Sequence, residues 1–258
     1  MNEVPEYVDL EAAKTASGLR LLTVAGVPSP WGEALKGICR VKQIPHKIAR
    51  IVPGHADGEL IRWTAQSSLP VAVYNDERPR SSWIDQLYLA ERLGPEPGLI
   101  PGAIADRIEM FGQSNELCGE NGLGWLRRLT LLDISLARGD QTGMAKALGA
   151  KYGYSKLAAE SAPAKTAEIL RHLAARLAEQ KQRGSKFLIG ERLSALDIYW
   201  ATFAALIDPL PREVCTMPRG LHALYGEIGP VVKAALDPSL IAHRDFIYRE
   251  YLKLPLEL

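Results

Sequence analysis

The spacing of hydrophobic and polar positions differs between the first and second parts of the chain. Up to about residue 93, short apolar runs predict strands over 19–27, near 47–52 and over 69–74. Helical spacing between and after them predicts helices from Ser29-Pro30 to a stop at Ile44-Pro45, and over 83–93. The stretch 53–68 predicts a loop with roughly one helical turn. This order indicates a compact α/β unit.

The second part of the chain begins after a proline- and glycine-rich stretch at 94–98. Beyond it nearly every segment has helical spacing, as in the stripe Leu170, Leu173, Ala174 and Leu177. The stretch therefore predicts a linker to an all-helical second half. Helices are predicted over 103–118, 123–136, 163–183, 195–207, 221–236 and from about 240.

The most specific local pattern begins the helix after residue 194. Ser194 is a typical N-cap, and Asp197 is placed to accept a hydrogen bond from the Ser194 backbone N–H, which makes a capping box with aspartate in the usual glutamate position. Leu193 and Ile198 occupy the hydrophobic staple positions. The helix continues to Ile207 almost without polar residues, so we expect it to be buried on every side and central in its domain.

Composition and charge narrow the function classes. The 258 residues suggest one or two domains with ample core material, since 47% are hydrophobic and 24% charged. The net charge is +1, from 31 basic and 30 acidic residues, and gives no electrostatic footprint for nucleic acid or an anionic membrane. We therefore expect no nucleic-acid partner and no membrane partner.

Targeting signals are missing from the sequence pattern. No apolar run approaches the roughly 20 residues of a membrane span, and residues 1–16 are acidic without an apolar signal core. The three cysteines Cys39, Cys118 and Cys215 form no CxxC pair, as in a reducing compartment. A cytoplasmic protein whose cysteines are packing residues is expected.

Other functional motifs are not matched. Gly119, Gly122 and Gly124 do not follow a strand in a βαβ unit, so they do not predict a nucleotide loop. The five histidines lack metal-ligand spacing, and no metal is expected. Arg127-Arg128 predict a helix face that meets solvent or a second subunit.

Four sequence fragments in a fixed order resemble the glutathione transferase family. They are Ser29-Pro30-Trp31, Leu69-Pro70-Val71, Ser82 with Tyr88-Leu89-Ala90-Glu91, and Phe187-Leu188-Ile189-Gly190 leading into the capping box. The resemblance runs from about Leu19 onward. It implies a thioredoxin-like α/β domain over 19–93, a linker over 94–102 and an all-α domain over 103–258, with 1–18 as an N-terminal extension. A homodimer is expected.

The resemblance implies glutathione as co-substrate and Ser29 as its catalytic partner. A thiol with a pKa of about 8.5 is mostly protonated at neutral pH, and a hydroxyl donor at a helix N-terminus favours the thiolate. Ser29 occupies the family's position for that group. It also fits a plain N-cap, and one hydroxyl can serve both roles. Serine in place of cysteine disfavours glutaredoxin-like disulfide chemistry.

Glutathione-binding residues follow from the same resemblance. Pro70 occupies the family's cis-proline position, so that the backbone of Leu69 pairs with the cysteinyl part of glutathione. Ser82 matches the serine that begins the third helix, but Ser81 replaces the usual acidic residue before it. Gln66 is a further candidate for contact with the peptide.

Some alternatives at this site stay open. Asp85 is one candidate to compensate for the missing acid, and a solvated surface aspartate is the other interpretation. Arg80 is a candidate to attract a carboxylate. A basic residue after the first helix often holds the glycyl carboxylate in the family, and Lys42, His46 and Lys47 are unranked candidates.

The electrophile is expected to bind beside Trp31 and the first helix after the linker. Phe111, Asn115 and Cys118, with Ile108, are spaced to share a face of that helix and predict a pocket wall with one polar group. Ordinary core packing is the alternative interpretation.

Two functions remain in view. The first is an enzyme that activates glutathione for attack on a small hydrophobic electrophile, by conjugation, dehalogenation, ether cleavage or isomerisation. The second is a transferase-like module without turnover that binds ligands or proteins, and Ser81 in place of an acid keeps it open. The sequence names no electrophile.

Overall fold

A computed structural model describes residues 5–52, 57–139 and 143–258, and these fold into two compact units. Unit 1 comprises Met1–Ile100 with the return segments Leu210–Pro218 and Ile247–Leu258, and unit 2 comprises Pro101–Pro209 and Arg219–Phe246. The predicted boundaries place both return segments in the helical domain, whereas they group with unit 1. Their contacts with unit 1 depend on tertiary packing, which a sequence pattern does not contain.

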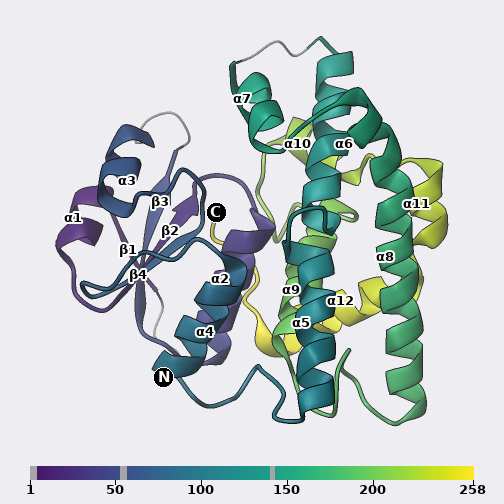
Figure 1. Ribbon diagram of the computed structural model, residues 1–258, viewed down its shortest axis with the longest axis horizontal. Helices are drawn as coiled ribbons and strands as arrows, with labels where there is room; N and C mark the ends of the chain where they lie inside the picture. Colours follow the sequence, from purple (N-terminus) through teal and green to yellow (C-terminus); the bar gives the residue numbers. More distant parts are fainter. Residues whose placement is uncertain (1–4, 53–56, 140–142) are drawn as a thin grey trace. The chain divides into compact units, whose positions relative to one another are not determined.

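A four-stranded mixed sheet organises unit 1 in the order β1-β3-β2-β4 (Figure 1). β3 is parallel to both β1 and β2, and β4 is antiparallel to β2. The bounds are β1 Glu6–Val8, β2 Leu19–Val24, β3 His46–Ile51 and β4 Val71–Tyr74. The three predicted strands are therefore present, and the N-terminal extension adds a fourth strand at the edge beside β3.

The pairing of the strands shows which buried residues lie on each face of the sheet. Leu22 pairs with Ala49 and Val71, and this face carries α1 (Leu10–Thr15) and α3 (Asp57–Thr64). Side chains alternate along a strand, so the neighbouring Leu21 points to the opposite face. On that side lie α2 (Pro30–Val41) and α4 (Trp83–Leu93), as Figure 1 shows. The predicted single turn in 53–68 was too short, since α3 runs for eight residues.

Unit 2 is built from helices, as predicted, with three differences in their bounds. α8 begins at Lys156, where the Ser155 side chain caps Ala158 N–H, and it contains Pro163 in its interior instead of beginning there. The predicted helix 221–236 is two helices, because Gly226 ends the first and Pro230 begins the second. α7 was not predicted. The helices are α5 Ile104–Cys118, α6 Leu123–Ala137, α7 Gly143–Lys151, α8 Lys156–Gln182, α9 Ala195–Phe203 with the 3-10 turn η1 Ala204–Leu206, α10 Arg219–Gly226, α11 Pro230–Ala235 and α12 Pro238–Tyr251.

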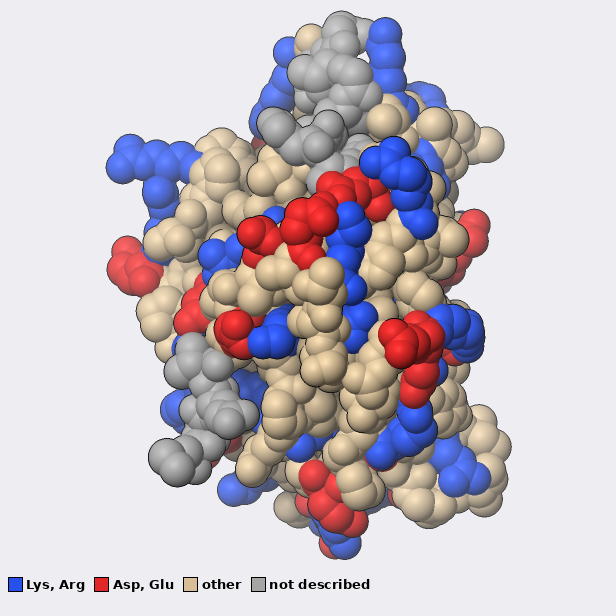
Figure 2. Space-filling view, turned by 90° about the vertical axis from the view of Figure 1, so that its left-hand side faces the viewer, with Lys and Arg blue, Asp and Glu red and all other residues tan. Residues whose placement is uncertain are grey.

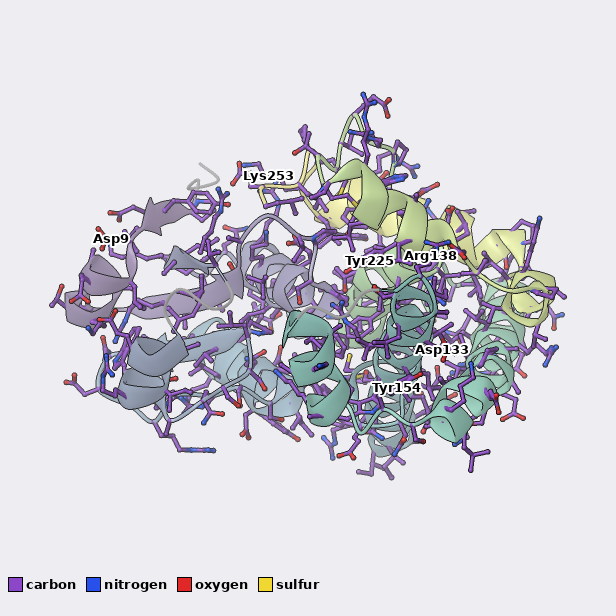
Figure 3. All side chains as sticks on the ribbon, turned by 90° about the horizontal axis from the view of Figure 1, so that it is seen from above. Asp9, Asp133, Arg138, Tyr154, Tyr225 and Lys253 are labelled. Carbon is purple, nitrogen blue, oxygen red and sulfur yellow. The ribbon has the colours of Figure 1, made fainter. Side chains whose placement is uncertain are left out.

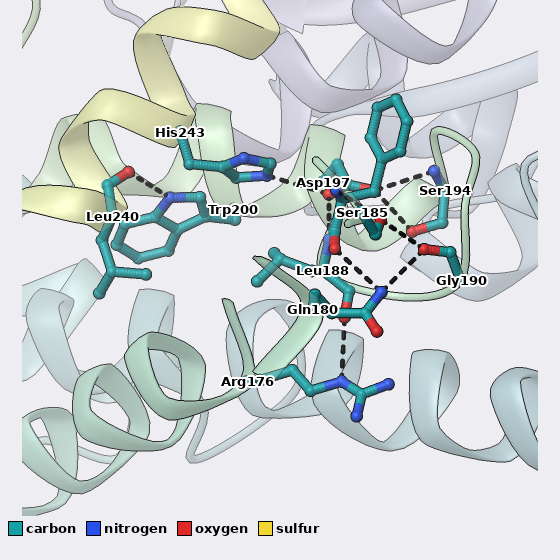
Figure 4. Close-up of polar contacts among 11 residues, drawn as sticks. Arg176, Gln180, Ser185, Leu188, Gly190, Ser194, Asp197, Trp200, Leu240 and His243 are labelled. Atoms are coloured by element: carbon teal, nitrogen blue, oxygen red, sulfur yellow. Dashed lines mark hydrogen bonds and ion pairs between the residues drawn. The ribbon is translucent and has the colours of Figure 1, made fainter. Parts of the chain in front are cut away.

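The helix α9 is the buried centre of unit 2, which confirms the prediction from its sequence. All nine of its residues are buried. The Asp197 carboxylate accepts hydrogen bonds from Ser194 N–H at 2.9 Å, Ser194 Oγ at 2.8 Å and Leu188 N–H at 2.8 Å, and His243 Nε2 lies 3.0 Å away (Figure 4). Trp200 Nε1 donates to Leu240 O at 2.9 Å. These bonds join α9 to the loop before it and to α12.

The surface charges and the cysteines of the folded chain can be compared with the expectations from composition. Figure 2 shows basic and acidic side chains interspersed on the face it displays, without a field of one sign. Cys39, Cys118 and Cys215 are all buried, and none of them forms a disulfide with another described residue. Across residues 5–52, 57–139 and 143–258, no helix combines the length and the apolar character that a membrane span needs. The same described residues contain no cluster of histidine, cysteine and carboxylate side chains suited to a metal ion.

Candidate functional site

Ser29 lies at the N-cap of α2, as predicted, and Pro30 occupies the first helical turn. The Ser29 carbonyl accepts from Glu33 N–H at 2.8 Å, so the backbone begins the helix in the usual way. Its side chain makes no capping hydrogen bond, although Ser29 is only 7% exposed. The hydroxyl is therefore not used by the helix itself, and it stands beside the positive end of a 12-residue helix.

The Leu69-Pro70 peptide bond is cis, as the resemblance implied, and it immediately precedes β4. A glutamine that the sequence analysis missed holds this turn in place. Gln86 is 4% exposed, and its Nε2 donates to Pro70 O at 3.0 Å and to Arg80 O at 3.0 Å. Gln86 thus ties the start of β4 to the segment before α4. A signal existed in the sequence, because Gln86 interrupts the apolar face of the predicted helix 83–93.

The structure brings Gln66, Ser81 and Ser82 together with this turn. Ser81 Oγ donates to Gln66 Oε1 at 2.6 Å, and Ser82 is the N-cap of α4. The Ser82 side chain makes no capping hydrogen bond. Two hydroxyls and one amide, without a carboxylate among them, therefore surround the beginning of α4.

The acidic residues nearest to this point in the sequence are engaged by arginines. Asp85 Oδ2 lies 3.7 Å from Arg78 at the surface. Glu77 bonds Arg92 at 2.6 Å and Arg80 at 2.7 Å, and these two hydrogen bonds, the Arg92 one first, lower the pKa of Glu77. Asp85 and Glu77 therefore both have arginine partners, and Arg80 shares the Glu77 carboxylate with Arg92.

The three basic candidates for a carboxylate contact already have partners. The ammonium of Lys42 is fully buried, and it bonds Glu91 at 2.6 Å and Pro97 O at 2.9 Å, which ties the end of α2 to α4 and to the following segment. Lys47 pairs with Glu6 of β1. His46 Nδ1 contacts Ile44 O at 2.7 Å. Lys42 in particular is a structural residue.

The predicted pocket residues are divided between the two units. Trp31 belongs to α2 of unit 1, and Phe111, Asn115 and Cys118 belong to α5 of unit 2. Asn115 is exposed, Phe111 is partly exposed, and Cys118 is buried with its thiol pKa raised by burial. The three helical residues thus differ in exposure, and their role in a pocket stays a prediction.

A polar cluster at α2 joins both ends of the chain and was not anticipated. Lys36 bonds Glu33 Oε1 at 2.8 Å and Glu257 O at 2.8 Å, and Tyr7 of β1 donates to Glu257 Oε2 at 2.6 Å. Arg50 lies 3.9 Å from the centre of the Tyr7 ring. Burial, followed by the bond to Glu257, raises the pKa of Tyr7 to about 12. The last residues of the chain therefore fasten β1 to α2.

Comparisons with known proteins place this geometry in a known fold. No protein-family model and no curated protein sequence matches the chain. A glutathione S-transferase from Methylobacterium radiotolerans, in complex with glutathione sulfonate, superimposes with a TM-score of 0.61 at 14% identity over 92% of this chain and 93% of that chain.

Two further structures show how widely the likeness extends. Rice GST1 in complex with glutathione gives a TM-score of 0.60 at 19% identity, with 93% of each chain covered. The nitrogen regulation fragment of the yeast prion protein Ure2p gives 0.61 at 10% identity, over 91% of this chain and 93% of that chain. A small mixed sheet followed by helices, matched over almost the whole length, shows that the chain has the glutathione transferase fold, with a thioredoxin-like unit and an all-helical unit.

Proposed function

We propose that the protein is a glutathione-dependent transferase that activates the glutathione thiolate for attack on a small hydrophobic electrophile. The observation that carries the proposal is Ser29, a nearly buried serine at the start of α2 whose hydroxyl makes no capping bond. Neighbours of the same fold bind glutathione or glutathione sulfonate. A hydroxyl in this position has the chemistry that a bound thiolate needs.

Ser29 would act by stabilising charge. The thiol of glutathione has a pKa of about 8.5, so only a small fraction is ionised at neutral pH. Donation from the Ser29 hydroxyl and the positive end of α2 both favour the anion. Lowering the thiol pKa by about two units requires roughly 2.7 kcal/mol of differential stabilisation. The thiolate would then attack the electrophile directly, without a covalent bond to the protein.

The peptide part of glutathione would lie against the turn before β4 and the start of α4. The backbone of Leu69, held by the Pro70 turn, would pair with the cysteinyl residue. Ser82 and the N-terminus of α4 would receive the glutamyl carboxylate. Gln66 and Ser81, already bonded to each other, would border the glutamyl end of the ligand.

The proposal also covers the second substrate, the assembly and the location of the protein. Trp31, Phe111, Asn115 and Cys118 are assigned to the electrophile's pocket, and no metal takes part. We further propose a cytoplasmic homodimer with roles in detoxification that binds neither nucleic acid nor membrane. These assignments follow from the resemblance and from the low net charge of +1.

A non-catalytic module is the second candidate. Ser81 favours it, because the glutamyl ammonium would lack a carboxylate partner at that position. The likeness to a nitrogen regulation fragment is compatible with such a role. A protein of this kind would bind a ligand or partner on the same fold without turnover.

Calorimetric titration of the full-length protein with glutathione is the first test. Saturable binding with micromolar to millimolar affinity is expected, and turnover with a halogenated, epoxide, aryl ether or peroxide substrate would then establish catalysis. Binding without turnover across that panel would favour the non-catalytic module. No binding at millimolar glutathione would contradict the proposed transferase.

A further inference from the structure

Two neighbouring arginines in α6, one buried and one partly exposed, have no carboxylate partner within the part of the chain that the structure describes. The sequence pattern predicted that Arg127-Arg128 meet solvent or a subunit, but Arg127 is only 1% exposed and Arg128 is partly exposed. No ion pair among the described residues includes either of them. Because burying a cation without a counter-charge is unfavourable, the surroundings of the two guanidinium groups need an explanation.

Arg127 has an explanation within the fold. Its guanidinium donates to the carbonyl oxygens of Leu206 at 2.9 Å, Tyr225 at 3.2 Å and Glu227 at 3.4 Å. Burial lowers the pKa of Arg127 to about 10, so it still carries its charge at neutral pH. Three backbone oxygens fix Arg127 as a bridge between α6, the 3-10 turn and the end of α10.

Arg128 differs from Arg127, because its partners are tyrosine side chains instead of backbone carbonyl oxygens. Its hydrogen bond from Nη1 to the Tyr225 hydroxyl is long, at 3.4 Å, and the side chain of Tyr152 is its second partner. Its guanidinium carbon lies 6.0 Å from the centre of the Tyr225 ring. Its Nε is buried and has no hydrogen-bond partner among the described residues. Such an orphaned donor is rare in native proteins and calls for an acceptor.

The nearest acid does not supply that acceptor. Glu227, which follows α10, uses its carboxylate to bond Arg138 at the C-cap of α6. Its backbone oxygen is taken by Arg127. The positive charge of Arg127 next in sequence adds to the field at Arg128. The cluster is thus electropositive, and an anion would be stabilised there.

Aromatic side chains surround this charge. Trp125, one turn before Arg128, donates from Nε1 to Tyr152 O at 3.0 Å, and the two rings meet edge to face with centroids 4.7 Å apart. Tyr225, labelled in Figure 3, lies on α10 and is 1% exposed. Trp125, Arg128 and Tyr152 are partly exposed, so the cluster reaches the surface of unit 2.

We propose that Arg128, with the hydroxyls of Tyr225 and Tyr152, binds the carboxylate of a small aromatic acid within unit 2. The planar fork of a guanidinium matches the two oxygens of a carboxylate, and tyrosine hydroxyls donate to the same group. The rings of Trp125 and Tyr152 suit an aromatic body next to that carboxylate. The site is independent of the glutathione site, which is assigned to unit 1.

The test uses the full-length protein without glutathione and compares benzoate with its neutral isostere benzamide. Calorimetry is expected to show benzoate binding at least tenfold tighter than benzamide. Arg128→Met should reduce benzoate affinity at least tenfold. Arg138→Met, which removes the same charge from the C-cap of the same helix, should change it less than twofold.

A second measurement applies even if the Arg128→Met variant fails to fold. In the wild-type protein labelled with ¹⁵N, one arginine Nε–H signal should move downfield with benzoate and stay in place with benzamide. That signal should be missing from Arg128→Lys, which keeps the charge and loses Nε. Equal binding of benzoate and benzamide, equal losses in the two methionine variants, or an unmoved set of Nε–H signals would each overturn the proposal.

Discussion

Ser81 Oγ donates a 2.6 Å hydrogen bond to Gln66 Oε1, joining the segment after α3 to the segment before α4. Both residues were predicted to border the same ligand, and the structure places them in contact. The pair is neutral, whereas the resemblance to glutathione transferases leads one to expect an acid at position 81. Neutral polar groups therefore stand where the proposal places the glutamyl end of glutathione.

Introducing the missing acid should strengthen glutathione binding modestly. Ser81→Glu would place a carboxylate where the resemblance puts the glutamyl ammonium, and an exposed ion pair contributes about 0.2 to 1 kcal/mol. We expect a roughly two- to fivefold gain in affinity by calorimetry. Ser81→Gln has a similar size without the charge and is the control. A gain of the same size in both variants would contradict an electrostatic origin.

Removing Lys42 should cost stability and leave glutathione binding unchanged. Lys42→Met leaves Glu91 without its ammonium partner and Pro97 O without its donor. We expect a loss of about 1 to 3 kcal/mol in unfolding free energy, measured with urea. Glutathione affinity should stay within twofold of wild type. A tenfold fall in affinity with an intact fold would show that Lys42 holds the ligand after all.

Removing Asp197 should destabilise unit 2 strongly. Asp197→Ala would leave the buried donors of Ser194, Leu188 and His243 without their acceptor. Breaking such a buried network costs about 3 to 5 kcal/mol. Urea unfolding followed by tryptophan fluorescence checks this, with Glu191→Ala at an exposed position as the control, expected within about 0.5 kcal/mol of wild type. Equal unfolding midpoints in the two variants would refute it.

Tyr7 should titrate at a higher pH than an ordinary tyrosine. Its contact with Glu257 should therefore contribute to folding stability up to alkaline pH. Burial and then the bond to Glu257 raise the pKa of Tyr7 from 10.0 to about 12. Folding favours the neutral phenol, so this contribution to stability is complete below pH 10 and is lost as the pH rises towards 12. Glu257→Gln should lower the Tyr7 pKa, observed by NMR of labelled tyrosine. An unchanged Tyr7 titration in that variant would argue against the bond.

Much of the fold was accessible from local sequence signals. Proline in the first turn after Ser29 and the capping box of Ser194 with Asp197 are local signals for helix starts, and both helices begin where predicted. The period of apolar residues revealed three strands and most helices. Pro163 misled the prediction, because proline is favoured in a first turn but is tolerated inside a long helix that begins with its own cap at Ser155.

The features that were missed arise from contacts between residues distant in sequence. Nothing local in Glu257 announces its bonds to Lys36 and Tyr7. The burial of Arg127 depends on carbonyl groups offered by two other segments of unit 2. The candidate site was partly accessible, since the resemblance indicated Ser29 and Pro70, whereas Gln86 needed the folded turn to reveal its partners.

The titration of the glutathione thiol on the protein tests the central claim most directly. Ultraviolet absorbance of the thiolate, followed against pH at saturating glutathione, gives the bound thiol pKa in wild type, Ser29→Ala and Ser82→Ala. We expect a pKa about two units below 8.5 in wild type and in Ser82→Ala, which removes a serine N-cap from α4 instead. In Ser29→Ala the pKa should return towards 8.5 with glutathione still bound. The same lowered pKa in wild type and Ser29→Ala would contradict the role assigned to Ser29.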